Sequence, residues 1–362
     1  MIILNDDLSS SDDELQPISS LSPLEHQANS GIVAAQIDLA KILQHGDQQH
    51  RRNPQKAFQW AQKAAESRHP EALHILARCY LDGVGTEKNI DLGYGLLKEA
   101  AFTHEHPDSM ATIANCWLTT HKAEKTPDQA KSLFKKAAKN GSAFGMFKLA
   151  ICYDKGIGTT IDQEKALLWY EAAADNGIAS AAKQLGDYYK SEPNSDPFKA
   201  FEYYSKAAES GMVEAMVQLS YLLSSGTGCT KNQETAREWM KKAADRGHSR
   251  AQNQVGHYYK RNNNMTLAVK YWTKCVRHGK GVPGSSDSAY QLGIAYQNGK
   301  GVDRNLRKAF LNYKQAANDS NYVKRTNAIK SVMHFLRNGM GVNRNDTEMR
   351  KWQALLRRIE PH

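Results

Sequence analysis

The chain has 362 residues, of which 40% are hydrophobic, and a formal net charge of +10. It contains no apolar run of about 18 residues, which excludes an ordinary membrane-spanning helix, and its N-terminus lacks the basic region and long apolar stretch of a secretory signal. Five cysteines, an odd number, favour a reducing compartment, so we expect a cytoplasmic location where the protein is made.

The first residues of the chain are acidic and of low complexity. Three consecutive serines lie between the acidic groups Asp6-Asp7 and Asp12–Glu14, which predicts a disordered tail over residues 1–20. Order is expected from Ser22, since Ser22, Pro23 and Glu25 have the spacing of a helix N-cap, first position and capping box. That short helix should end before Gly31 and cap whatever follows.

Two interleaved series of small residues then run to the end of the chain, each with steps of 32 to 41 residues. The first series is Ala35, Ala72, Ser109, Gly145, Ala181, Ala215, Ala251, Ser288 and Ala328. The second series is Ala57, Gly93, Ala130, Ala166, Ala200, Ala236, Ala268, Ala309 and Met349. Apolar residues follow each member at helical spacing, which predicts a buried stripe on a first and a second helix of every repeat. Such self-similarity is typical of a solenoid.

The turns between the predicted helices have their own signature. Five of them carry Gly-x-Gly, where glycine adopts a positive φ without steric cost (Gly83/Gly85, Gly156/Gly158, Gly226/Gly228, Gly299/Gly301 and Gly339/Gly341). Further glycines end the second helices at Gly141, Gly177, Gly211, Gly247 and Gly279. About eighteen helices of roughly 12 to 14 residues are expected. Three turns, near Pro127, Pro193 and Asn262, lack Gly-x-Gly, and repeat packing should be least regular near residues 260–290.

Segments such as Lys165–Ala173 and Ala181–Lys190 resemble Sel1-like repeats, which are relatives of tetratricopeptide repeats. The resemblance implies an all-α, right-handed α/α superhelical solenoid of about nine helix-turn-helix repeats. It would occupy residues 21–358 as one extended domain, with repeats starting near residues 31, 69, 106, 142, 178, 212, 248, 285 and 325 and a tail at 359–362. The family implies an adaptor or scaffold in protein complexes, found in bacterial signalling and virulence proteins and in eukaryotic quality control, and it implies no chemistry.

Candidate catalytic and metal-binding residues all have a structural interpretation. Cys79, Cys116 and Cys152 occupy the same position of successive first helices, and stacked helices lie too far apart for a disulfide or a shared zinc ion, so we interpret them as small core residues. His104-Glu105-His106 is interpreted as a loop. No nucleophile-elbow, HExxH, P-loop or GxGxxG motif is present, so we expect no enzymatic activity, cofactor, metal or small-molecule substrate.

In tetratricopeptide-like arrays the first helices line the concave side, and the resemblance therefore implies which residues face a partner. Positions −1, 2, 6 and 9 relative to the small residue lie opposite the buried stripe. On this basis Glu71, His74, Arg78, Val217, Asp187 and Ile294 face the groove, together with the predicted partner-binding residues. These are Phe144, Phe147, Ile151, Lys183, Lys190, Tyr221, Arg250, Asn253, His257, Lys260, Tyr290, Lys330 and Arg337.

Two features of this surface suggest how it would bind. Phe144, Phe147 and Ile151 form an apolar anchor, unless superhelical twist turns them against an adjacent helix. Lys183, Lys190, Arg250, Lys260, Lys330 and Arg337 form a basic stripe that suits a peptide's carboxylates.

Charge is the most uneven property of the chain. Residues 1–40 hold seven acidic and no basic side chains, residues 41–230 hold 22 of each, and residues 231–362 hold 26 basic and nine acidic ones. A basic last third attracts acidic peptides, nucleic acid or anionic lipid, or is simply a solvated surface. The acidic tail could also occupy the basic stripe as a self-inhibitor.

The sequence therefore predicts a non-enzymatic interaction scaffold that holds an acidic or apolar segment of another protein in its concave groove. The alternative is a binder of nucleic acid or anionic lipid through the basic C-terminal third. A bacterial signalling adaptor and an effector delivered into a host cell would both use this mechanism, and the sequence does not separate them.

Overall fold

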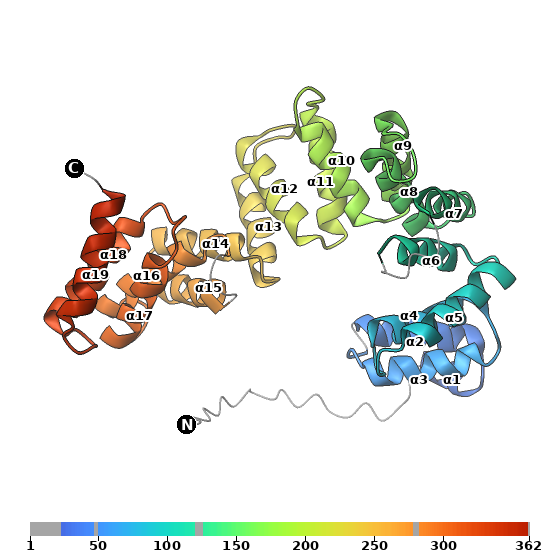
Figure 1. The fold of residues 1–362 in the computed structure, drawn as a ribbon, viewed down its shortest axis with the longest axis horizontal. Helices are drawn as coiled ribbons and strands as arrows, with labels where there is room; N and C mark the ends of the chain where they lie inside the picture. Colours follow the sequence, from blue (N-terminus) through green and yellow to red (C-terminus); the bar gives the residue numbers. More distant parts are fainter. Residues whose placement is uncertain (1–22, 47–49, 120–125, 278–281, 361–362) are drawn as a thin grey trace. The chain divides into compact units, whose positions relative to one another are not determined.

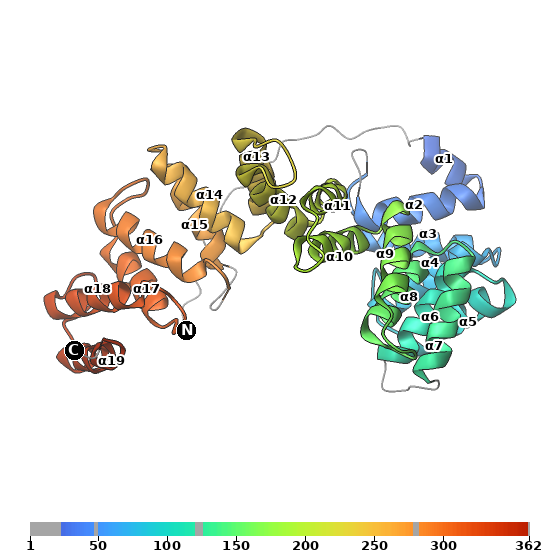
Figure 2. The ribbon, with the colours of Figure 1, turned by 90° about the horizontal axis from the view of Figure 1, so that it is seen from above.

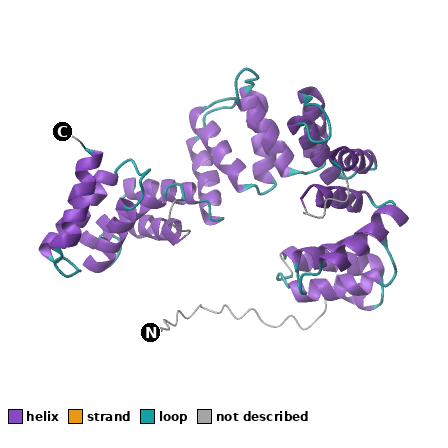
Figure 3. Ribbon diagram, in the orientation of Figure 1, coloured by secondary structure: helices purple, strands orange, loops and turns teal. Residues whose placement is uncertain are grey.

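The computed structural model describes residues 23–46, 50–119, 126–277 and 282–360. Within these residues all regular secondary structure is helical, with nineteen α-helices, one π-helical turn and no strand (Figure 3). The predicted all-α class is confirmed. The predicted acidic tail (1–20) and Gly279 lie outside the described residues.

The chain divides into two compact units, residues 1–169 and 170–362, and the division falls within helix α9 (Gln163–Asp175). In each unit, neighbouring helices in the chain lie side by side (Figures 1 and 2). Unit 1 contains α1 (Pro23–Asn29), α2 (Val33–His45), α3 (Pro54–Ala65), α4 (Pro70–Asp82), α5 (Ile90–Lys98), the π-helical turn Glu99–Thr103, α6 (Pro107–Thr119), α7 (Pro127–Lys139) and α8 (Ala143–Lys155).

Unit 2 continues the alternation of first and second helices. It contains α10 (Ala179–Lys190), α11 (Pro197–Glu209), α12 (Val213–Ser225), α13 (Gln233–Asp245), α14 (Ser249–Arg261), α15 (Met265–Arg277), α16 (Ser285–Asn298), α17 (Leu306–Ala317), α18 (Arg325–Asn338) and α19 (Asp346–Ile359). Two helices differ from the expected 12 to 14 residues. Helix α1 has seven, and α5 has nine before it widens into the π-helical turn.

The two series of small residues form the core of the helix pairs. All nine members of the first series are buried, and so are eight of the second, Met349 of the last helix being half-buried. Small side chains at these positions let the two helix backbones approach closely, and the larger apolar side chains on either side fill the remaining space. The small residues that mark each repeat in the sequence are therefore the residues at which its helices pack together.

The second helices also share an N-terminal cap. An Asn or Asp side chain accepts a backbone hydrogen bond at the start of eight of them, and Thr126 with Gln129 forms a capping box at the ninth. The capping residues are Asn53, Asn89, Asp162, Asp196, Asn232, Asn264, Asn305 and Asn345. Each cap satisfies an otherwise unpaired N–H and fixes where the second helix begins.

The Gly-x-Gly turns do more than end a helix. Both glycines of every such turn have a positive φ, as expected. The second glycine also lies against the first turn of the preceding repeat's second helix: a Cβ at Gly85 would be 2.0 Å from the Pro54 carbonyl oxygen, and one at Gly158 would be 2.3 Å from the Pro127 oxygen. Gly228, Gly301 and Gly341 repeat this contact at Pro197, Met265 and Leu306. The turn is thus a contact between repeats.

A second close approach is specific to unit 2. Three first helices carry a glycine five positions after the small residue, where a large aromatic ring of the following second helix crosses. A Cβ at Gly186 would lie 2.9 Å from the Tyr204 ring, one at Gly256 would lie 2.3 Å from Trp272 Nε1, and one at Gly293 would lie 2.6 Å from the Tyr313 ring. All three rings are buried.

Unit 1 has alanines at the same position. Ala77 and Ala114 are fully buried, and they share a cluster with Leu97 and Phe134 of the second helices. In α12 of unit 2 the position is Ser220, whose hydroxyl donates to the Ala236 carbonyl at 2.7 Å. The residue at this position between the two helices of a repeat is therefore glycine, alanine or serine in different repeats.

Candidate partner-binding surface

The predicted apolar anchor lies on α8 in unit 1. Phe144, Phe147 and Ile151 are all half-buried. Phe144 packs against the main hydrophobic cluster of the unit, and Lys148 Nζ lies 5.2 Å from its ring centroid. For Phe144 the alternative interpretation therefore holds, since its ring has a packing role in addition to any contact with a partner.

A pair of histidines lies where α4 meets the start of α6: His74 is in α4, and His106 directly precedes α6. His74 Nδ1 and His106 Nδ1 each lie 3.0 Å from the Ser109 hydroxyl, and the ring centroids are 5.2 Å apart. Burial, helped by His106 and Arg78, lowers the pKa of His74 to about 4 against the opposing effect of Asp108 and Glu71. Burial also lowers the pKa of His106. Both rings are therefore neutral near pH 7, and they hold α4 and α6 together through one serine.

In unit 2 the predicted groove residues form hydrogen bonds between successive first helices. Lys190 Nζ donates to Gln218 Oε1 at 2.8 Å, which links α10 to α12. The Tyr221 hydroxyl accepts from Gln254 Nε2 at 2.7 Å, which links α12 to α14. Three bonds link α14 to α16: Ser288 Oγ to Asn253 Oδ1 at 2.9 Å, His257 Nε2 with Asp287 Oδ2 at 2.5 Å, and Lys260 Nζ to Gln291 Oε1 at 2.7 Å.

The α14–α16 contact is stabilised by charge. Burial by itself would raise the pKa of Asp287, but hydrogen bonds from His257, Asn253 and Tyr322 outweigh it and hold the pKa below its usual value. The carboxylate is therefore ionised and accepts from three neighbours. Such a network fixes the side chains of this face before any partner arrives.

The basic stripe is only partly available to a partner. Lys183 pairs with Asp187 in α10, and Lys330 pairs with Glu360 at 3.2 Å. With Lys190 and Lys260 also hydrogen-bonded, Arg250 and Arg337 remain as exposed guanidinium groups for which the described residues provide no ion pair or hydrogen bond.

Two groove residues have a different environment from the one expected. Val217 is 2% exposed and belongs to the core of α12, so its assignment to the groove is wrong. The position is covered because α12 packs against its neighbours on more than one face. Tyr290 is half-buried, with its ring 5.6 Å from that of Tyr313 and 6.2 Å from that of Tyr322. Its ring is thus mainly a packing element.

A pocket of about 710 Å³ opens in unit 2 between α12, α13 and α14. It contains two predicted groove residues, Tyr221 and His257. The remaining lining residues are Ser220, Ser224, Gln233, Glu234, Ala236, Arg237, Glu238, Met240, Lys241, Gln254, Val255, Tyr258, Tyr259 and Arg261. The pocket thus combines three tyrosine rings with two arginines, one lysine and two glutamates. Tyrosine and arginine are the residue types among these that are enriched at protein interfaces.

Tyr258 and Arg237 are the functional candidates that the sequence analysis missed. Tyr258 is 39% exposed, and the Arg237 guanidinium carbon lies 5.5 Å from its ring centroid, close enough for a cation–π contact. The signal that could have identified Tyr258 is its size, because the same position holds cysteine in three earlier repeats. Arg237 was missed because the groove residues were taken from the first helices alone, and Arg237 lies in the second helix α13.

No group of three His, Cys, Asp or Glu side chains among the described residues could hold a metal ion. None of the helices in the same part of the chain has both the length and the hydrophobicity needed to cross a bilayer. Cys79, Cys152 and Cys275 are buried, and Cys116 is half-buried. Burial raises the pKa of the Cys152 thiol to about 11, which leaves it unreactive at neutral pH.

Comparison with known proteins agrees with this architecture. A family model described as the Sel1 repeat matches residues 33–69, 70–101, 124–142, 143–178, 179–212, 213–248 and 286–321. The crystal structure of c5321, a protective antigen of uropathogenic Escherichia coli strains with an SLR fold, is similar with a TM-score of 0.58 and 24% identity. The similarity covers 92% of this chain and 70% of that one, and it shows the fold.

Curated relatives include two fungal regulators. Chitin synthase regulatory factor 3 of Schizosaccharomyces pombe is 26% identical over 238 residues, which cover 63% of this chain and 22% of the relative. Chitin synthase regulator SKT5 of Saccharomyces cerevisiae is 28% identical over 238 residues, which cover 61% of this chain and 34% of the relative. The chain thus spans about a fifth to a third of the length of these relatives. With most of its repeats matched by the family model, the chain belongs to the Sel1-repeat family and has the α/α solenoid fold of helix pairs.

Proposed function

We propose that the chain is a non-enzymatic adaptor that binds an acidic segment of a partner protein in the α12–α14 pocket. The observation that carries the proposal is the pocket itself, in which exposed Tyr258 stacks with Arg237 and lies beside Arg261. An aromatic side chain of the partner would pack on the tyrosines, and a neighbouring carboxylate would pair with an arginine.

The charge of the surrounding sequence supports an acidic partner. Residues 231–362 carry 26 basic and nine acidic side chains, and Arg250 on α14 is exposed. A positive field of this kind accelerates the approach of an acidic segment and repels basic ones. The network between α14 and α16 reduces the side-chain entropy that binding would otherwise remove.

The names of the fungal relatives favour a regulatory role. Both are called regulators of an enzyme, and the Sel1 repeats that this chain shares with them generally serve as scaffolds for protein partners. We therefore place the chain among adaptors that control another protein. Its suggested roles in bacterial signalling or as a delivered effector stay predictions.

The test uses two peptide libraries that differ only in charge. Dodecapeptides with one aromatic residue among glutamates should bind the full chain, and the same peptides with glutamine should not. Arg237→Gln with Arg261→Gln should weaken the tightest peptide about tenfold, the factor expected from losing two interface charges. The matched control, Lys324→Gln with Arg350→Gln, removes the same charge from exposed sites of unit 2 outside the pocket and should have little effect.

The alternative is contact with nucleic acid or anionic lipid through the basic last third. Duplex DNA and phosphatidylserine vesicles are the probes, because phosphate binding falls steeply as salt rises. Strong, steeply salt-dependent binding of either probe that both double variants weaken equally would contradict the adaptor proposal.

A further inference from the structure

A pocket of about 400 Å³ lies in unit 1 between α3, α4 and α5. Leucines of α4 and α5 form its apolar part, and polar or charged side chains form the rest. The lining residues are Gln62, Ala65, Glu66, Arg68, Leu73, Leu76, Leu96 and Glu99. Arg68 and Glu99 form an ion pair with each other at 2.5 Å. The lining residues include no aromatic ring.

In unit 2 the corresponding position carries a tyrosine ring. Leu96 lies three residues after the small residue of α5, the position that Tyr203 has in α11 and Tyr271 has in α15. The Tyr271 hydroxyl donates to Asp245 of the preceding second helix at 2.9 Å. The Tyr203 hydroxyl lies 3.5 Å from Glu171 of the second helix before it. In those repeats a phenol ring therefore extends from one second helix to an acid of the preceding one.

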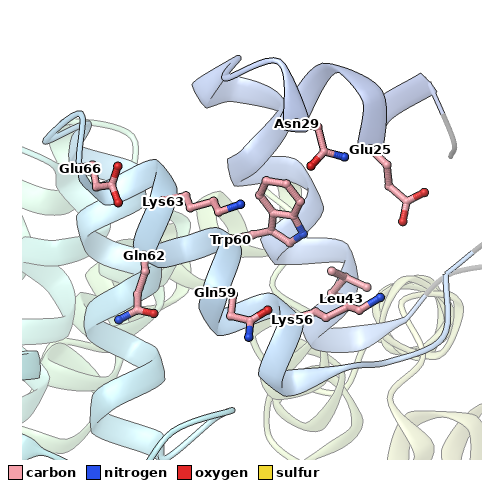
Figure 4. Close-up of a pocket in the computed structure, with 9 residues that line it drawn as sticks. All are labelled: Glu25, Asn29, Leu43, Lys56, Gln59, Trp60, Gln62, Lys63 and Glu66. Carbon is pink, nitrogen blue, oxygen red and sulfur yellow. The ribbon is translucent and has the colours of Figure 1, made fainter.

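The acid is present in unit 1 as well, but the ring is not. Glu66 lies nine residues after the small residue of α3, the position that Asp245 has in α13. The Glu66 carboxylate has no ion pair or side-chain hydrogen bond within the described residues. It lies directly after α3, and Gln62 one turn earlier points away from α1 (Figure 4). Because Leu96 replaces a tyrosine, both a space and an acceptor are left.

The outer side of α5 leaves room for a partner to reach this space. Leu92, one helical turn before Leu96, is 53% exposed and adds apolar area beside the pocket. A Cβ at Gly95 would meet no atom within 4 Å. With no side chain at that position, the backbone of a partner can come close to α5.

We propose that this pocket binds a tyrosine side chain of a partner protein. The ring packs on Leu73, Leu76 and Leu96, and the hydroxyl donates to Glu66, as the tyrosines of α11 and α15 do toward their own acids. Phenylalanine would leave the carboxylate without a donor, and lysine would not cover the leucines. The site shares no residue with the α12–α14 pocket, so it goes beyond the adaptor proposal.

The experiment follows leucine methyl signals of the full chain by NMR. The probes are the capped peptide Ala-Ala-Tyr-Ala-Ala-Lys and its phenylalanine counterpart. The tyrosine peptide should shift the methyl signals of Leu73, Leu76 and Leu96. It should also bind about tenfold more tightly than the phenylalanine peptide, the factor expected from a hydrogen bond to a carboxylate.

Glu66→Gln tests the hydrogen bond. The variant should reduce the preference for tyrosine by about threefold or more, because the amide oxygen carries no charge. Glu66 also lines a pocket between α1 and α3, together with Glu25 (Figure 4). Glu25→Gln is therefore the matched control, since it removes a carboxylate from that pocket alone and should leave the preference unchanged.

Leu96→Tyr tests the space. Its ring should fill the pocket as Tyr203 does in α11 and abolish binding of the tyrosine peptide. Leu96→Met keeps roughly the volume of leucine and should retain binding. Equal affinities for the two peptides, or binding that survives Leu96→Tyr, would overturn the proposal. Leucine signals that change on dilution without peptide would assign the pocket to a second copy of the chain and would also overturn it.

Discussion

Unit 1 and unit 2 fill the space between the two helices of a repeat in different ways. In unit 1, buried alanines such as Ala114 on the first helix lie in the same cluster as Phe134 on the second. In unit 2, Gly186, Gly256 and Gly293 take the place of alanine, and tyrosine or tryptophan rings cross them. Glycine in a helix costs about 1 kcal/mol relative to alanine, so these rings must return at least that much through burial.

In unit 2 the second helices reach polar groups on the first helices. The Tyr204 hydroxyl reaches Asp187 at 2.6 Å, and the Tyr313 hydroxyl reaches Gln297 at 2.7 Å. Both acceptors lie on first helices. Because glycine lets the ring pass, a second helix can position polar groups on the opposite face. Phe134 and Leu97 carry no such group. In unit 1 the polar contacts include those at Ser109 and the bond that Trp117 Nε1 of α6 donates to the Tyr94 hydroxyl of α5 at 2.7 Å.

The largest expected difference between the units is the loss of stability of unit 1 at acidic pH. The pKa of His74 is about 4 in the folded protein against 6.5 for a free side chain, so below pH 6.5 protons bind the unfolded chain first. Unit 1 should therefore lose up to about 3 kcal/mol of stability as the pH falls from 6.5 to 4. Peptide-resolved hydrogen exchange, corrected for its intrinsic pH dependence, measures this loss. His74→Gln should remove most of it, and an unchanged slope in that variant would contradict the assignment.

The second largest effect on the free energy of unfolding is expected from substitutions in the glycine–aromatic pairs of unit 2. Gly256→Ala places a Cβ 2.3 Å from Trp272 Nε1, and we expect a loss of about 2 kcal/mol after the gain in helix propensity. Adding Trp272→Phe recreates the Ala114–Phe134 combination of unit 1 and removes an indole N–H that has no acceptor within the described residues. A double-mutant cycle in urea should therefore show positive coupling. Additive losses would mean that the ring does not occupy the space above Gly256.

The reverse exchange in unit 1 should have an effect no larger than that of Gly256→Ala. Ala77→Gly removes one buried methyl group, which costs about 0.8 kcal/mol, and adds backbone freedom, which costs about 1 kcal/mol, so we expect a loss of roughly 2 kcal/mol. Thermal unfolding of this variant beside Gly256→Ala compares the two losses, and a clearly larger loss for Ala77→Gly would contradict the comparison between the units.

Much of the fold could be predicted because it repeats. The small residues and the Gly-x-Gly turns follow from local periodicity, and the start of α1 at Pro23 follows from the capping pattern around it. The caps at Asn53, Asn89 and their equivalents recur in the sequence with the same period. The π-helical turn at Glu99–Thr103 could not be foreseen, since it depends on how α5 meets its neighbours.

The candidate site was less predictable for a physical reason. Facing positions follow from helical geometry, and two of the predicted residues, Tyr221 and His257, line the pocket. Whether a lysine there is free depends on its neighbour one repeat away, as Lys190 with Gln218 shows. Repeat lengths vary, so the sequence does not give that pairing. Tyr258 was expected in the core and is exposed, whereas Val217 was expected to be exposed and is buried. Both differences depend on how each helix packs against its neighbours.

The second glycine of each Gly-x-Gly turn contacts the second helix of the preceding repeat. This contact limits where extra residues can be inserted into the chain. A residue added between Gly83 and Asn89 would pull Gly85 away from the Pro54 carbonyl and loosen the junction of two repeats. The turn at residues 191–196, which has no such glycine, bears no equivalent constraint. Epitope tags or reporter loops grafted for imaging therefore belong in that turn, where they leave the stacking of neighbouring repeats untouched.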